Sequence, residues 1–145
     1  MHYLKAPVII ATGSSNKKDI CLSMGATHFV DRNSEDFVAT ATAATTGGVD
    51  CVFDCVGGPY FAKNLASLAL DSTYVFYGLL GGFEVADSSF LKTMLMKRIT
   101  LKPTTLRSRS DTYKGALILD FAMDVRAQAK RAQAKRAYLI VERTR

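Results

Sequence analysis

The stretch from Val49 to Gly58 combines a buried-looking strand with a turn that could hold a ligand. It follows the Gly47-Gly48 pair, is apolar for most of its length and ends in two glycines before Pro59. A nearly continuous apolar run between turn signals predicts a strand buried on both faces, as in parallel α/β sheets. Glycines at the carboxyl end of such a strand let a cofactor approach the backbone closely. An ordinary strand-to-helix turn in the core explains the same pattern, so both interpretations stay open.

Small or polar residues follow every predicted strand. We expect strands over residues 8–12, 27–30, 49–56, 73–77 and 99–106. The segments that follow them, rich in Gly, Ser, Thr and charged residues, are 12–15, 31–32, 55–58, 78–82 and 104–107. The carboxyl ends of parallel strands share one edge of the sheet, so these five segments should converge on a single crevice.

Helices are predicted between these strands, over residues 17–24, 34–45, 59–70 and 88–97, and after the last strand, over residues 111–123. Strict alternation of strands and helices implies right-handed crossovers. The predicted fold class is therefore α/β, a doubly wound parallel sheet with helices on both faces. Pro103 cannot donate a ladder hydrogen bond, so residues 99–106 should form an edge strand.

Length and composition are those of one soluble domain. The chain has 145 residues, of which 48% are hydrophobic and 22% charged. The sequence contains no apolar run near the ~18 residues of a membrane span, so no membrane association is expected. It also shows no signal peptide, and we expect a cytoplasmic location.

The cysteines and histidines suggest neither a disulfide nor a metal site. Cys51 and Cys55 lie on one predicted strand, roughly 13 Å apart, which is too far for a bridge. With Cys21 the thiols are three in number, which fits a reducing compartment. His2 and His28 have no cluster of further ligands beside them, so we expect no metal.

The positive charge is concentrated in the tail. Residues 1–125 contain twelve basic and twelve acidic side chains, whereas residues 126–145 contain seven basic side chains against Glu142. The tail repeats Arg-Ala-Gln-Ala-Lys and should be partly helical or disordered, because its charges spiral around a helix. Nucleic-acid binding is therefore expected only through this tail. Residues 138–141 could add a strand or dock on the body.

Several segments, taken in order, carry a family resemblance. They are 12–18, 25–26, 48–58, Asn64 with Leu-Ala-Leu-Asp at 68–71, Tyr-Gly-Leu-x-Gly-Gly at 77–82 and Leu-Arg-Ser-Arg at 106–109. Together they resemble the Rossmann-like cofactor-binding domain of the zinc-independent quinone oxidoreductases, in the medium-chain dehydrogenase/reductase superfamily, over residues 6–123. The resemblance implies NADP(H) as cofactor and hydride transfer to a quinone or enone without a metal.

The resemblance also implies roles for individual residues. The pocket for the adenosine 2′-phosphate falls on Ser14, Ser15, Lys18 and Arg32. An NAD-selective site usually carries Asp or Glu after the second strand, whereas hydroxyls and lysines here suit a dianionic phosphate. A plain helix N-cap with solvated lysines is the alternative. The positions that line the pyrophosphate and nicotinamide fall on Cys55, Val56, Gly57, Tyr77, Gly78, Leu79, Leu106 and Arg107, although Arg107 could equally pair with a surface carboxylate.

Two parts of the family pattern have no counterpart in this sequence. One is the catalytic domain, and the other is the first strand with its Gly-rich turn. In the strand order 3-2-1-4-5-6 that first strand is central. We therefore expect an incomplete sheet in a truncated chain, in which residues 8–12 and 49–56 pair directly or leave an open gap. Weak cofactor affinity and no quinone reduction by this chain alone should follow.

The predicted function is that of the NADPH-binding portion of an oxidoreductase, with residues 1–125 as a partial domain and residues 126–145 as a basic tail. None of the residues is predicted to be a catalytic acid or base. The alternatives are a non-catalytic NADPH- or RNA-binding module and a nonfunctional remnant. A homodimer through residues 99–106 is also expected, because the corresponding family strand commonly pairs with its twin.

Overall fold

The computed structural model describes residues 6–131 and 137–141, with side chains described through residue 123. Its described strands form a six-stranded sheet of order β2-β1-β6-β3-β4-β5. Every neighbouring pair is parallel. The strands are β1 (Val8–Gly13), β2 (His28–Asp31), β3 (Val49–Asp54), β4 (Leu68–Phe76), β5 (Thr100–Pro103) and β6 (Ala137–Val141).

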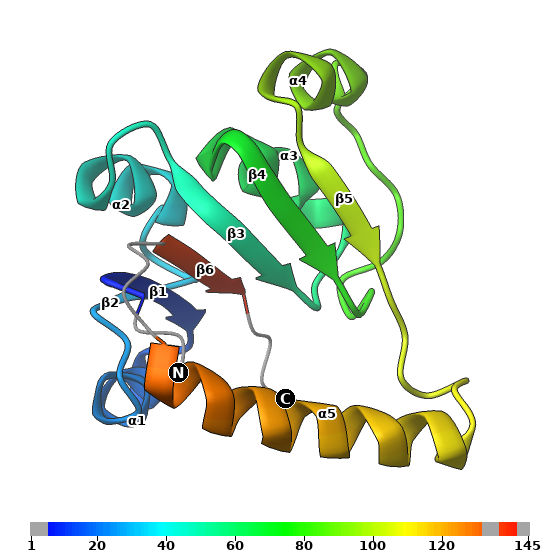
Figure 1. Cartoon of the computed structure of the whole chain (residues 1–145). Coiled ribbons are helices and arrows are strands. Elements are labelled where there is room, and N and C mark those ends of the chain that lie inside the picture. Colours follow the sequence, from blue (N-terminus) through cyan, green and yellow to red (C-terminus); the bar gives the residue numbers. More distant parts are fainter. Residues whose placement is uncertain (1–5, 132–136, 142–145) are drawn as a thin grey trace.

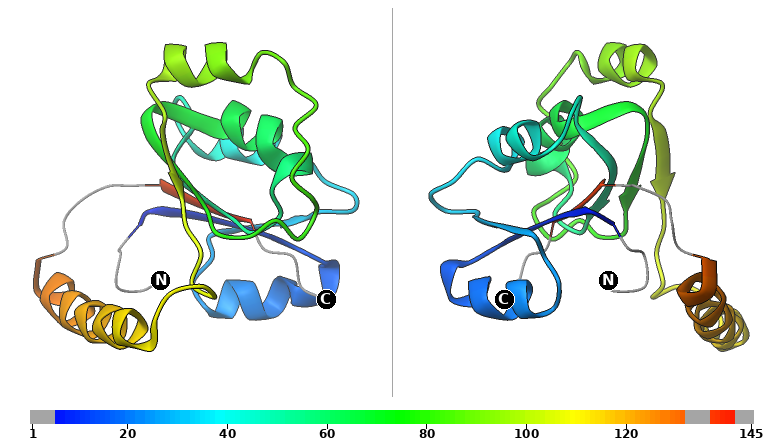
Figure 2. Two further views of the ribbon diagram at one scale, coloured as in Figure 1. Left: turned by 90° about the vertical axis from the view of Figure 1, so that its right-hand side faces the viewer. Right: turned by 60° about the vertical axis from the view of Figure 1, so that its left-hand side comes forward.

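Helices cover both faces of the sheet, as the alternating pattern predicted. One face carries α2 (Phe37–Ala44), α3 (Gly58–Ser67) and α4 (Phe90–Lys97), and the other carries α1 (Lys18–Ser23) and α5 (Asp111–Arg131) (Figures 1 and 2). A single 3-10 turn, η1 (Ser15–Lys17), precedes α1. None of the helices among the described residues is long and apolar enough to cross a lipid bilayer.

The core lies between the central strands and the layer of α2 and α3. Ile10 of β1, Val52 of β3 and Leu65 of α3 are each at most 1% exposed. The ring of Phe61 from α3 packs at 5.4 Å from that of Tyr74 and at 5.6 Å, edge to face, from that of Phe90. In the apolar run over residues 49–56, Val49, Val52 and Asp54 are fully buried, whereas Asp50 is exposed and Phe53 is half-buried, so the run is a core strand followed by its turn.

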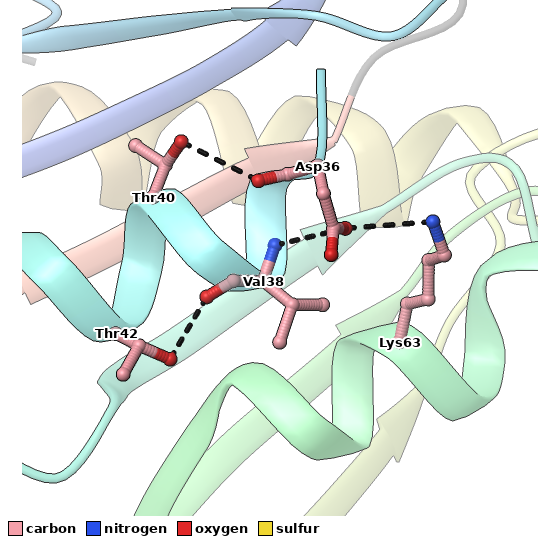
Figure 3. A network of polar contacts seen from close by, with 5 residues as sticks. All are labelled: Asp36, Val38, Thr40, Thr42 and Lys63. Atoms are coloured by element: carbon pink, nitrogen blue, oxygen red, sulfur yellow. Dashed lines mark hydrogen bonds and ion pairs between the residues drawn. The ribbon is translucent and has the colours of Figure 1, made fainter. Parts of the chain in front are cut away.

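Polar contacts at the start of α2 connect it to α3 (Figure 3). Asp36 is the N-cap of α2, and its Oδ1 accepts a hydrogen bond from the backbone N–H of Val38 at 3.3 Å. The same oxygen pairs with Lys63 Nζ of α3 at 3.4 Å. The hydroxyls of Thr40 and Thr42 donate to backbone carbonyls four residues earlier, at 3.4 and 2.9 Å. The cap satisfies a free N–H of the first turn and fixes where the helix begins.

The end of α3 and the start of β4 differ from the sequence prediction. The helix predicted over residues 59–70 ends at Ser67, and β4 begins at Leu68 rather than at residue 73. The β3–β4 register shifts between Val49 and Cys51, where β4 accommodates extra residues in an irregular bulge. Asp71 lies in this bulge with φ +56°. The extra residues of the bulge interrupt the alternation of inward and outward side chains that marks a strand in a sequence. The start of β4 was therefore predicted as the end of the preceding helix.

Lys97 at the end of α4 stabilises the end of α3. Its ammonium group donates to the backbone carbonyl oxygens of Leu65, Ala66 and Leu68 at 2.9, 3.0 and 2.6 Å. These are orphan acceptors at the carboxyl end of a helix, where a cation is favoured. Partial burial lowers the pKa of the Lys97 amine from its ordinary value.

The edge position predicted for residues 99–106 is confirmed, since β5 ends the strand order. The strand is shorter than predicted and stops at Pro103. The next amide, Thr104 N, donates to Phe76 O of β4 at 3.0 Å, and the chain then leaves the sheet.

The sequence predicted that residues 8–12 and 49–56 either pair directly or leave an open gap at the centre of the sheet, and both predictions were wrong. The strands β1 and β3 neither pair with each other nor leave a gap, because β6 lies between them. Thus residues 138–141 add a strand, which the sequence left open. Of the predicted tail, residues 126–131 belong to α5 and 137–141 to β6. The remainder of that tail lies outside the described residues.

Candidate functional site

The carboxyl ends of the strands lie in register at one edge of the sheet. Gly13 is paired with Asp31, and Asp54 with both Phe76 and Val141. Phe76 is in turn paired with Pro103 of β5. The loops that follow these strands therefore begin at a common edge, as predicted. This is the edge at which open parallel sheets bind ligands.

Two of these loops, residues 55–58 and 78–82, are joined by backbone hydrogen bonds. Leu80 N donates to Cys55 O at 3.0 Å, and Gly81 N donates to Val56 O at 2.8 Å. In the opposite direction, Gly58 N donates to Gly82 O at 2.9 Å. The structure thus brings together the candidate residues of these two loops, which are Cys55, Val56, Gly57, Tyr77, Gly78 and Leu79.

Glycine is required at the points where these loops touch. Gly57 has φ +88°, and a Cβ there would lie 2.6 Å from Leu79 Cδ2 and 2.7 Å from Gly82 O. A Cβ on Gly78 would lie 2.9 Å from Cys55 O. The absence of side chains at these positions is explained by close packing between the loops, so these glycines alone do not identify a cofactor cradle.

A buried carboxylate under the first loop holds it in place. Asp54, at the end of β3, is 0% exposed. Its Oδ1 accepts from Val56 N at 2.6 Å and from Gly57 N at 3.2 Å, and its Oδ2 accepts from Tyr74 OH at 2.6 Å and from Asn64 Nδ2 at 3.1 Å. The carboxylate therefore connects the loop to α3 and β4.

The ionisation of Tyr74 responds to this environment. Burial, followed by the nearby negative charge of Asp54 and the hydrogen bond to it, raises the pKa of the Tyr74 phenol above its ordinary value. Asp54 and Tyr74 were not among the predicted site residues, and Asn64 entered only through the resemblance. The available signal was an acidic residue at the end of an otherwise apolar strand, which needs a partner when it is buried.

A second group of candidate residues lies at the ends of β1 and β2. Ser14 occupies the N-cap position of η1, but its side chain makes no capping hydrogen bond. Arg32 N donates to Gly13 O at 2.9 Å, which holds the start of the β2 loop against the end of β1. Ser15 and Lys18 are exposed on η1 and α1. The alternative of a plain helix N-cap therefore does not explain why a hydroxyl side chain stands at position 14.

Two buried polar atoms at this end of the sheet have no hydrogen-bond partner among the described residues. They are Arg32 Nη1 and Thr12 Oγ1. A buried donor without a partner is costly and requires an explanation. The guanidinium group of Arg32 has the donor geometry that matches phosphate oxygens. The acidic groups of this loop are engaged with its own amides, since Asp31 Oδ1 accepts from Asn33 N at 3.0 Å and Glu35 Oε2 from Asp31 N at 2.6 Å.

Leu106 and Arg107 lie apart from these two groups. They follow β5 in the loop that leads to α5, and both are exposed. Leu106 O accepts from Arg109 N at 3.2 Å, which closes a turn within that loop. Within residues 6–131 and 137–141 the structure contains no group of three or more His, Cys, Asp or Glu that could hold a metal ion. We therefore assign none of the described side chains to a metal.

Comparison with known proteins gives a consistent family. A family model described as zinc-binding dehydrogenase matches residues 2–121. The mouse "Quinone oxidoreductase-like protein 2" is 35% identical over 97 residues, which are 66% of this chain but 27% of the mouse protein. The chain thus spans about a quarter of the length of that relative.

Solved structures show the same fold. The Bacillus subtilis protein yhfP with NAD bound has a TM-score of 0.62 at 20% identity, covering 81% of this chain and 35% of its own. Mycobacterial Rv1454c complexed with NADPH has a TM-score of 0.61 at 16% identity, covering 86% of this chain and 54% of its own. From the family match and this fold, the chain belongs to the zinc-binding dehydrogenase family of oxidoreductases, in the medium-chain dehydrogenase/reductase superfamily, and corresponds to their Rossmann-like domain.

Proposed function

We propose that this chain is the NADPH-binding portion of a cytoplasmic oxidoreductase that transfers hydride from NADPH to a quinone or activated alkene. The observation that carries the proposal is the buried Arg32 Nη1, which has no partner among the described residues. It lies in the loop after β2, beside the loop after β1 that holds Ser14 and Ser15. The 2′-phosphate is what distinguishes NADPH from NADH, and Arg32 with Lys18 and the two serines supplies donors for it.

The cofactor would lie across the carboxyl edge of the sheet. In the proposed arrangement the adenosine end contacts the loops after β1 and β2, and the pyrophosphate and nicotinamide approach the loops at Cys55–Gly57 and Tyr77–Leu79. Adjacent strands are about 4.8 Å apart, so the loops after β1 and β3 are separated by roughly 10 Å across β6. An extended dinucleotide is long enough to bridge that separation. When bound, the nicotinamide supplies the hydride chemistry, and this chain orients it.

The proposal assigns the side chains to binding and not to proton transfer. We place none of the described residues in the role of a catalytic acid or base. Asp54 keeps the loop at Cys55–Gly57 in position through its contacts to the Val56 and Gly57 amides. Leu106 and Arg107 remain proposed contacts near the nicotinamide.

The test compares the dissociation constants of NADPH and NADH by titration. We expect the chain to prefer NADPH, and Lys18→Glu to remove most of that preference. A charge-assisted hydrogen bond contributes about 1.5–3 kcal/mol, which corresponds to roughly a tenfold or larger change in affinity. Lys92→Glu, with the same charge change on the exposed surface of α4, is the matched control and should leave the preference intact. Equal dissociation constants for the two cofactors in the unmodified chain would refute the proposal.

Turnover is a separate question from binding. We propose that residues 1–145 alone do not reduce a simple quinone, because they correspond to only 27% of the mouse relative. Purified chain that oxidises NADPH with a simple quinone well above the uncatalysed rate would contradict this statement without affecting the binding proposal.

Self-association through β5 is also proposed. The strand lies at the edge of the sheet, and its outer backbone groups can pair with a second copy. Sedimentation at micromolar concentration should show a dimer, and Leu101→Lys should weaken it. A monomer at that concentration would rule the dimer out.

A further inference from the structure

The centre of the sheet contains a strand from the far end of the chain. Ala137–Val141 pairs with Val8–Thr12 of β1 on one side and with Cys51–Asp54 of β3 on the other, parallel to both. Figure 1 shows β6 lying between these two strands. A doubly wound sheet normally has the first strand of its fold in this position. Here the position is filled by a strand that follows α5 in sequence.

The strands on both sides of β6 belong to the most buried part of the molecule. Ile10 on β1 and Val52 on β3 are 0% exposed, and Asp54 is equally buried. Backbone N–H and C=O groups at such a depth must be paired, since an unpaired buried amide costs about as much as a lost hydrogen bond. β6 pairs with both strands at once, so it satisfies the facing backbone groups of the two halves of the sheet.

The residues of β6 suit this position. Ala-Tyr-Leu-Ile-Val is an uninterrupted apolar run without proline or charge. Such runs are typical of strands buried on both faces of a parallel sheet, and each of these residues can donate a backbone N–H. The slot between β1 and β3 therefore suits an extended, apolar segment without proline.

The connection of β6 to the body is long. The helix before it, α5, has 21 residues and is about 31 Å long at 1.5 Å per residue. Its Ile118, Leu119 and Phe121 are 66–67% exposed, so this part of the helix is not packed into the core.

We infer that the slot between β1 and β3 is a strand-binding site, filled within the same molecule by residues 137–141. The site takes its strand parallel to both neighbours, in the register that places Val141 beside Thr12 and Asp54. It accepts the same segment as a separate peptide when the covalently linked strand is disabled. This inference does not depend on the proposed cofactor or substrate.

Hydrogen exchange of the full-length chain tests the inference directly. In the unmodified protein, at a concentration where sedimentation shows monomer, amides of residues 138–141 should exchange at least about 100-fold more slowly than in an unfolded chain. Exchange of these amides at the unfolded rate, with β1 and β3 still protected, would overturn the inference. Protection that appears only when a dimer forms would overturn the intramolecular assignment.

A proline substitution and a peptide provide the second test. Leu139→Pro removes a backbone donor from the central strand, so amides of β1 and β3 should exchange at least about tenfold faster. Lys102→Pro, in the edge strand β5, is the matched control and should affect only β4 and β5. A peptide of residues 136–145 added to the Leu139→Pro protein should restore slow exchange in β1 and β3, and a scrambled peptide should not. Unchanged exchange in the Leu139→Pro protein, or equal rescue by both peptides, would overturn the inference. If the Leu139→Pro protein does not fold, the exchange rates of amides 138–141 in the unmodified protein still test whether this segment occupies the slot.

Discussion

Gly57 and Gly47 form a matched pair for testing how the loop at residues 55–58 is held. Both have φ +88°, a conformation that side-chain-bearing residues rarely adopt. A Cβ on Gly57 would meet Leu79 Cδ2 at 2.6 Å and Gly82 O at 2.7 Å, whereas a Cβ on Gly47 would meet nothing within 4 Å. Alanine at the two positions therefore has the same unfavourable φ but differs in steric overlap.

The structure sets the expected magnitudes. A positive φ costs an alanine about 1–2 kcal/mol, and at Gly57 the ψ of −135° adds to that strain because it lies outside the left-handed helical region. At Gly57 the overlap adds the cost of overpacking, typically about 1–3 kcal/mol, because one of the overlapping atoms is a backbone carbonyl oxygen that cannot rotate away. We expect Gly57→Ala to lower the free energy of unfolding by about 2–5 kcal/mol and Gly47→Ala by about 1–2 kcal/mol.

Urea denaturation of the three proteins measures the difference between the two variants. The midpoints should fall in the order unmodified, Gly47→Ala, Gly57→Ala, with an unchanged slope of free energy against denaturant. Equal destabilisation by the two substitutions would refute the argument that the loops at 55–58 and 78–82 are closely packed. Under the proposed function Gly57→Ala should also weaken NADPH binding, and Gly47→Ala should not.

Two further substitutions test contacts described above. Tyr74→Phe removes the hydroxyl that donates to Asp54, and at pH 7 it should cost about 1.5–3 kcal/mol, while Tyr113→Phe on the exposed surface of α5 should cost little. Because the folded-state pKa of Tyr74 is raised, the phenol's contribution to the free energy of unfolding is complete below about pH 10, the pKa of an unfolded chain's tyrosine. Above that pH the contribution declines by about 1.4 kcal/mol per pH unit. The difference in free energy of unfolding between the unmodified protein and Tyr74→Phe, measured by urea titration, should therefore narrow above about pH 10. A difference independent of alkaline pH would contradict that reasoning. Lys97→Met leaves three carbonyls at the end of α3 without their donor and should lower the thermal midpoint, corresponding to about 1–2 kcal/mol. Lys92→Met, on the same helix, should have no comparable effect.

Local patterns in the sequence were sufficient to predict the class of fold and most of its elements. The apolar run ending at Gly57-Gly58 indicated a central parallel strand, and the position of Pro103 indicated an edge strand, because both signals act within a few residues. The common edge of the strand-end loops followed from alternation of strands and helices. The resemblance over residues 6–123 added the medium-chain dehydrogenase/reductase superfamily, which the family match confirmed.

The tertiary structure alone decided how distant segments meet. The pairing of β6 with β1 and β3 joins residues more than 80 positions apart, and apolar composition at 137–141 does not specify which edge such a strand joins. The bulge that begins β4 and the turn-to-turn packing of Gly57 likewise depend on partners that are remote in sequence. In the sequence Asp54 is one more residue of the predicted strand, whereas the fold places Tyr74 and Asn64 within hydrogen-bond distance of its carboxylate. Periodicity and propensity describe neighbours along the chain, whereas strand order, register and buried polar networks are set by contacts across it.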